Sequence, residues 1–142
     1  MPDHNDTLEL PVHSQAVAQA LEWLESIAER QEWPARATFG LTLCLDEALT
    51  NVVSYAFQPA PAVIEPAITL ACRAHGRNIV LELRDNGRPY DPTAETSPPL
   101  AATLDDAIPG GHGLRLMRHY LEDLRYQRQG EWNCLTMVMP LP

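Results

Sequence analysis

The chain has few basic residues and a marked excess of acidic ones. Its 142 residues include 19 aspartates and glutamates against 10 lysines and arginines, which gives a formal net charge of −9. Nucleic-acid binding depends mainly on basic patches that release counterions from phosphates. The charge balance therefore argues against a polyanion as the principal partner and favours a basic protein surface.

Long apolar runs are missing and cysteine is scarce. The polar, acidic N-terminus lacks the hydrophobic stretch of a signal peptide, and no segment approaches the length of a membrane span. The three cysteines, Cys44, Cys72 and Cys134, are widely spaced within apolar patterns, so buried free thiols in a reducing compartment are the simplest interpretation. We expect a soluble, cytoplasmic protein that does not act on membranes.

Clusters typical of a metal site are also absent from the sequence. His112 lies between glycines and His119 follows a full heptad later, without a cysteine or carboxylate at ligand spacing. The sequence has no internal repeat and no low-complexity tract. A hydrophobic content of 45% over residues 1–142 suits a single domain with a substantial core.

What is present is a regular succession of strand and helix patterns. The patterns predict strands over about 7–12, 67–74, 78–85, 124–129 and 134–139, and helices over about 14–31, 34–55 and from 114 onward. This order predicts an α+β fold, a two-layer sandwich in which one mixed, mostly antiparallel sheet carries helices on one face.

One predicted strand ends abruptly at a carboxylate. The alternating run that ends at Asp85 is followed by the turn signal Asn86-Gly87, and Pro89 and Pro92 prevent the ladder from continuing. Asp85 could simply cap the turn, or it could accept a hydrogen bond from a ligand amine held over the sheet.

A second polar feature interrupts the otherwise apolar second helix. Glu47 and Asn51 stand one turn apart and share a face. Taken alone, this pattern favours a solvated side of an amphipathic helix. The functional alternative is a carboxylate and an amide oxygen that point together into a cleft, where they could act as a base and as a ligand of a hard cation.

The longest irregular stretch covers residues 91–109. It is rich in proline and lacks sustained periodicity, although a short helical turn over about 100–106 fits its sequence. Long loops inside small domains are often functional lids. The glycine cluster at 110–114 follows and opens a helix, an arrangement suited to phosphate binding but also common in ordinary turns.

In this fixed order, the three features resemble the GHKL family of ATP-binding domains, which includes gyrase, histidine kinases and anti-sigma-factor serine kinases. The segments that carry the resemblance are 47–51, 85–92 and 110–114. The second and third segments, together with Met117-Arg118, are most similar to the anti-sigma kinase branch. The resemblance spans nearly the whole chain and implies the Bergerat ATP-binding fold.

The resemblance also implies roles for individual residues. Glu47 would be the general base, and Asn51 would supply an oxygen ligand to Mg²⁺. Asp85 would accept a hydrogen bond from the adenine amine, Gly87 would let the base approach the backbone, and Tyr90 would belong to the same ATP-binding segment.

The remaining implied ATP contacts lie in and after a lid at about 91–111. The residues expected to hold phosphates are Gly110, Gly111, His112, Gly113 and Leu114. Thr136 matches a family position near the adenine-binding aspartate, where it could support that aspartate through a hydrogen bond or a water molecule. An ordinary strand threonine is the alternative interpretation.

The activity implied is that of a serine/threonine-protein kinase using ATP and Mg²⁺. It would phosphorylate a serine of an anti-sigma-antagonist protein, hold a sigma factor in the alternative state, and form a homodimer. No lysine or arginine lies between Asp91 and Gly113 to neutralise a transferring phosphoryl group, and Arg115 and Arg118 are either helpers or plain surface residues. This gap leaves open a non-catalytic, ATP-dependent interaction module. The lack of a phosphoacceptor-histidine helix argues against a complete histidine kinase.

Overall fold

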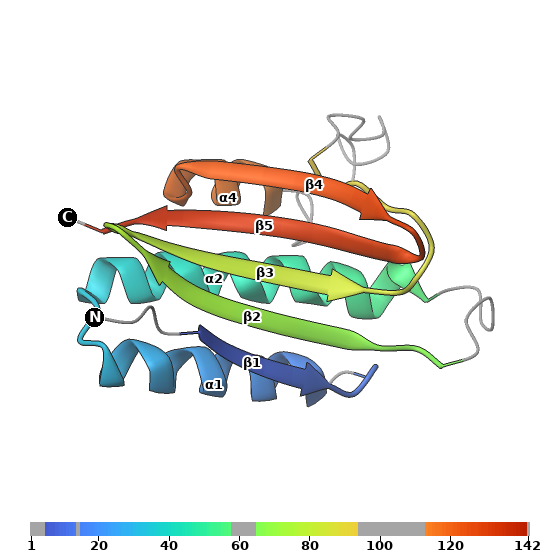
Figure 1. Cartoon of the computed structure of the whole chain (residues 1–142), viewed down its shortest axis with the longest axis horizontal. Coiled ribbons are helices and arrows are strands. Elements are labelled where there is room, and N and C mark those ends of the chain that lie inside the picture. The colour runs from blue at the N-terminus through green and yellow to red at the C-terminus, as the bar shows by residue number, and fades with distance from the viewer. Residues whose placement is uncertain (1–4, 14, 58–64, 94–112, 142) are drawn as a thin grey trace.

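A computed structural model of the chain describes residues 5–13, 15–57, 65–93 and 113–141. The strands are β1 (Asn5–Leu10), β2 (Ile68–His75), β3 (Asn78–Asp85), β4 (Asp123–Gln129) and β5 (Trp132–Pro140). The helices are α1 (Gln15–Arg30), α2 (Ala35–Asn51) and α4 (Gly113–Tyr120), and a π-helical turn, η1 (Val52–Ala56), continues α2. All three helices cover one face of the sheet (Figure 1), so the predicted α+β sandwich is confirmed. In the described part of the chain, no helix could cross a membrane.

The five strands form one sheet in the order β1-β2-β3-β5-β4. Every pairing among these strands is antiparallel, whereas the sequence predicted a mixed sheet. The reason is that β2 and β3, like β4 and β5, are hairpins with short turns at Gly76 and Gly130, where φ is +62° and +60°. The two hairpins meet where β3 pairs with β5. The pairings outside the hairpins, β1 with β2 and β3 with β5, are antiparallel as well.

Alternation along the strands decides which side chains face the helices. The helix-facing residues of the two central strands are Ile79, Leu81, Leu83, Leu135, Met137 and Met139, all of them buried in the core. Asp85 and Asn133 continue this alternation at the ends of the two strands and pair with each other in the β3–β5 register. Two polar side chains thus stand in line with the core.

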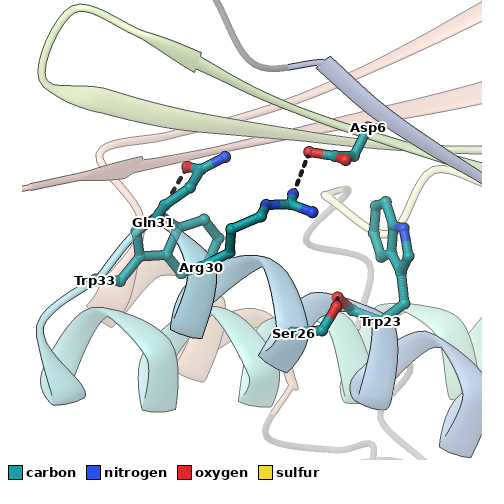
Figure 2. Close-up of polar contacts among 6 residues, drawn as sticks. All are labelled: Asp6, Trp23, Ser26, Arg30, Gln31 and Trp33. Carbon is teal, nitrogen blue, oxygen red and sulfur yellow. Dashed lines mark hydrogen bonds and ion pairs between the residues drawn. The ribbon is translucent and has the colours of Figure 1, made fainter.

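Polar contacts fix the end of α1 and its connection to α2 (Figure 2). The Arg30 guanidinium pairs with Asp6 of β1 over 2.9 Å. The indole N–H of Trp33 donates to Oε1 of Gln31 over 3.1 Å. Trp33 itself is buried, which anchors the turn. Helix α2 then runs along the sheet, and its C-terminal end lies at the same end of the molecule as the C-terminal end of β3 (Figure 1).

The predicted strands and helices all appear, with ends shifted by a few residues. The first strand begins at Asn5 rather than near residue 7, and the second helix ends in the π-helical turn. All three cysteines are free and buried, as predicted. The helical turn suggested over about 100–106 lies outside the described residues.

Candidate functional site

Asp85 is the polar centre of the site. Its side chain is only 3% exposed. Oδ1 accepts the backbone N–H of Gly87 over 2.9 Å and the side-chain amide of Asn133, also over 2.9 Å. Among the described residues no hydrogen bond reaches Oδ2. Asp85 therefore caps the turn with one oxygen, and the other has no hydrogen bond within the described part of the chain, so the two interpretations of the sequence are compatible.

The environment of Asp85 combines burial with compensating donors. Burial raises the pKa of this carboxyl above its ordinary value, because a charge is poorly solvated there. Hydrogen bonds from Asn133 and from the Gly87 amide, and the positive charge of Arg128, oppose the shift. The donors all favour the ionised carboxylate, which can only accept hydrogen bonds.

Asn133 is the site residue that the sequence reasoning missed. It is 4% exposed and lies opposite Asp85 on β5. Besides Asp85, its amide donates to the Arg88 carbonyl over 2.8 Å, and its Oδ1 accepts the Tyr90 N–H over 3.3 Å and the Tyr126 hydroxyl. The available signal was a polar residue in phase with the apolar positions 135, 137 and 139.

Gly87 is required by packing against η1. A Cβ at this position would overlap the backbone carbonyl oxygen of Ala56. That carbonyl also accepts the Arg88 N–H over 2.8 Å, while the Gly87 carbonyl accepts Nη1 of Arg128 over 2.8 Å. The family resemblance implied that Gly87 gives a base access to the backbone, but the contact with Ala56 already accounts for the glycine.

A pocket lies above the Asp85–Asn133 pair. Its walls are formed by Ala48, Val52, Leu83, Asp85, Tyr90, Pro92, Tyr126, Asn133 and Leu135. Apolar and aromatic walls with a few converging polar groups are typical of small-molecule sites. A flat, largely apolar ring that carries an amine matches this lining, since the carboxylate supplies an acceptor at one end. Tyr90, predicted from the sequence, belongs to the pocket.

Glu47 and Asn51 of α2 are not among the residues that line this pocket. Each directly precedes a pocket residue, Ala48 and Val52 respectively. Both side chains are half-buried. The Glu47 charge is close enough to contribute to the raised pKa of Tyr90, whose largest cause is burial. The structure thus brings the carboxylate of α2 towards the pocket that contains Asp85.

Thr136 is not brought to Asp85. It pairs with Glu82 of β3 and Arg125 of β4, three residues from the Asp85–Asn133 pair. Strand alternation places it on the sheet face opposite the helices, whereas Asp85 points towards them. The expectation that Thr136 supports the aspartate is therefore wrong, and Asn133 occupies that role in the structure.

The predicted phosphate-binding segment is described only in part. Gly110, Gly111 and His112 lie outside the described residues, as does most of the lid. Gly113 begins α4 and Leu114 is half-buried in its first turn. Among the described residues no group of three histidine, cysteine or carboxylate side chains could hold a metal ion.

Comparison with known proteins agrees with this geometry. The family described as histidine kinase-like ATPase domain matches residues 10–139. The chain is 55% identical over 139 residues to serine/threonine-protein kinase BtrW of Bordetella bronchiseptica, across 97% of this chain and 95% of that protein. The histidine kinase domain of a blue-light activated kinase from Erythrobacter litoralis EL346 shares the fold, with a TM-score of 0.57 at 15% identity over 92% of this chain and 64% of that one. The chain belongs to the family of histidine kinase-like ATPase domains.

Proposed function

We propose that this chain is a serine/threonine-protein kinase that uses ATP to phosphorylate a serine of an anti-sigma-antagonist protein and regulates transcription by partner switching. The observation that carries the proposal is the 55% identity to a serine/threonine-protein kinase across 97% of the chain. The predicted ATP-binding segments lie within the matched region. We further propose that it acts in the cytoplasm as a homodimer that also binds a sigma factor.

Adenine recognition is assigned to the Asp85 pocket. Oδ2 of Asp85 would accept a hydrogen bond from the exocyclic amine, while Ala48, Val52 and Leu135, which line the pocket, would contact the ring. Guanine presents a carbonyl at the same ring position. An ionised carboxylate offers no donor to that carbonyl, so the pocket selects adenine.

Phosphoryl transfer is assigned to Glu47 and Asn51 of α2. Glu47 would take the proton from the serine hydroxyl as its oxygen attacks the γ-phosphorus, and the bond from that phosphorus to the bridging oxygen breaks to release ADP. Asn51 would give one oxygen ligand to Mg²⁺, which supplies charge neutralisation when bound with the nucleotide. Gly110, Gly111 and Gly113 would contact the phosphates through their amides.

The supply of positive charge near the phosphates is limited. The chain has no lysine, and no arginine occurs between Asp91 and Gly113. Arg118 of α4 is placed towards the start of the lid, because its Nη2 donates to the Thr93 carbonyl over 3.4 Å. This contact favours Arg118 over Arg115 as the cation that assists transfer.

A second function follows from the same scarcity of cations. If charge neutralisation is too weak for transfer, the domain would act as a non-catalytic module in which ATP controls the sequestration of a regulatory protein. This alternative keeps the Asp85 pocket and dispenses with the role of Glu47 as a base.

The two functions separate in a phosphorylation assay. Labelled ATP, Mg²⁺ and a candidate antagonist domain would be incubated with the wild type, with Glu47→Gln and with Glu25→Gln as an exposed control on α1. The kinase predicts transfer that Glu47→Gln abolishes and Glu25→Gln preserves. Nucleotide-dependent partner binding without transfer, unchanged in Glu47→Gln, would overturn the kinase and support the module.

A further inference from the structure

We infer that Asn133 is a positioning residue that holds Oδ1 of Asp85 as an acceptor with Oδ2 towards the pocket, and thereby supports the selectivity for adenine over 6-oxopurines. The inference rests on the proposed role of Asp85 in reading the adenine amine. It adds a residue outside the three family segments, on a strand 48 positions further along the chain.

All hydrogen-bonding capacity of the Asn133 side chain is used. Its Nδ2 donates to Oδ1 of Asp85 over 2.9 Å and to the Arg88 carbonyl over 2.8 Å. Its Oδ1 accepts from the Tyr90 N–H over 3.3 Å and from the Tyr126 hydroxyl. Two donated and two accepted bonds are the full complement of a primary amide.

This saturation fixes the direction in which the amide points. Rotation by 180° would set Nδ2 against the Tyr90 N–H and Oδ1 against the Arg88 carbonyl, and each contact would lose its complement. The orientation therefore always presents an N–H to Asp85. Since the Gly87 N–H reaches the same Oδ1, that oxygen must act as an acceptor.

The consequence for the pocket concerns Oδ2. With Oδ1 held by two donors, the carboxylate cannot rotate freely, and Oδ2 is the oxygen left for a ligand. An amide donor does not titrate in the physiological range, so its hydrogen bond to Oδ1 does not change with pH there. A carboxylic acid at position 133 would titrate, and a hydroxyl could rotate between donating and accepting.

Asn133→Asp tests the inference by replacing the amide nitrogen of the side chain with an oxygen. Two carboxylates in contact share one proton, and the second ionisation of the pair is shifted upward. When singly protonated, the new side chain donates to Oδ1 as the amide did, so ATP still binds. As pH rises, both groups ionise and repel, and the Kd for ATP should rise by up to about tenfold for each pH unit above the shifted pKa.

The Kd of any variant for ATP also changes with pH because the phosphates of ATP ionise. The Kd of Asn133→Asp must therefore be compared with that of the wild type at the same pH. The ratio of the Kd of Asn133→Asp to that of the wild type, measured by calorimetry at each pH, cancels ionisation of the phosphates. Gln127→Glu is the matched control, because it makes the same amide-to-carboxylate change on an exposed β4 residue. Its ratio should stay flat, whereas the Asn133→Asp ratio should climb on the alkaline side. A flat ratio for a folded Asn133→Asp would overturn the inference.

A second variant covers the case in which Asn133→Asp does not fold. Asn133→Ser removes the fixed amide, and the preference for ATP over ITP should fall by at least about tenfold. A residue that merely supports the fold would weaken both nucleotides equally, and that result would overturn the inference. Asp85→Asn tests the proposed adenine site separately from the role of Asn133. If Asp85→Asn leaves the ATP affinity unchanged, the proposed adenine site fails, whatever the Asn133 variants do.

Discussion

The backbone carbonyl of Ala56 lies against Gly87 so closely that a side chain on residue 87 would overlap it. Ala56 ends the π-helical turn that continues α2, and Gly87 follows Asp85 at the end of β3. The contact therefore joins the pocket segment to the helix that carries Glu47 and Asn51. Turns of the π type often occur at functional sites. Here the turn sets how the helix meets the strand that ends at Asp85.

Gly87→Ala should disturb this junction. We expect a loss of about 2–3 kcal/mol in the free energy of unfolding, because the backbone around Ala56 must shift to admit a methyl group. The affinity for ATP should also fall, since Asp85 moves with the segment. Urea denaturation and calorimetry measure the two effects.

A matched glycine variant distinguishes the junction from general strain. Gly130 has φ of +60° with open space around it, so Gly130→Ala should lose about 1–2 kcal/mol through backbone strain alone. Its affinity for ATP should match that of the wild type. If Gly87→Ala also kept wild-type affinity, the junction would have no role in positioning Asp85.

Asp85→Asn should separate stability from binding. The asparagine keeps an oxygen that accepts from the Gly87 N–H and from Asn133, and it removes a buried charge. The free energy of unfolding at neutral pH should therefore stay constant or rise by about 1 kcal/mol. Thermal and urea unfolding provide the measurement. Strong destabilisation would show that the carboxylate stabilises the fold, contrary to its raised pKa.

The wild type should show opposite pH trends in stability and in binding. Because burial raises the folded-state pKa of Asp85, the folded protein binds this proton more readily than the unfolded one. Its contribution to the free energy of unfolding therefore falls as pH rises from its ordinary pKa of 3.8 through the folded value. ATP affinity should rise over the same window, since the ionised form accepts the amine.

The contribution of Asp85 is obtained as a difference between wild type and Asp85→Asn across that window. Other carboxylates titrate there in both proteins and cancel to first order. A difference that does not change with pH, in either stability or affinity, would contradict the raised pKa.

Cys44 and Cys72 should resist alkylation in the folded protein. Burial raises the pKa of each thiol to about 12. The thiolate is the reactive form, so modification at mildly alkaline pH should be on the order of a thousandfold slower than for a free cysteine. Iodoacetamide pulses followed by mass spectrometry test this. Rapid labelling of either residue under native conditions would contradict the burial.

Local patterns were sufficient to predict most of the fold and the principal pocket residue. The alternation that ends at Asp85, followed by a turn, is a property of adjacent residues, and the structure confirms the strand and its end. Such features depend on neighbouring backbone geometry, which the sequence encodes directly. Tyr90, by contrast, was expected only because the same segment resembles the family.

The remaining features depend on pairing between distant segments. Thr136 was expected near Asp85 from the resemblance, but three residues along a strand reverse the face, and the register with β3 is a tertiary property. The contact of Gly87 with Ala56 and the π-helical turn arise in the same way, from how α2 meets the end of β3. No sequence pattern within α2 or within β3 specifies how these two elements contact each other.

The role of Asp85 in reading adenine is tested most directly by calorimetric titration of ATP and ITP into the wild type and Asp85→Asn. The wild type should bind ATP about tenfold to a hundredfold more tightly than ITP, because ITP carries an oxygen where ATP carries the amine. Asp85→Asn should lose that preference, since its amide can donate to the ITP oxygen. A folded Asp85→Asn that binds ATP with wild-type affinity and preference would contradict the assignment of this pocket to adenine.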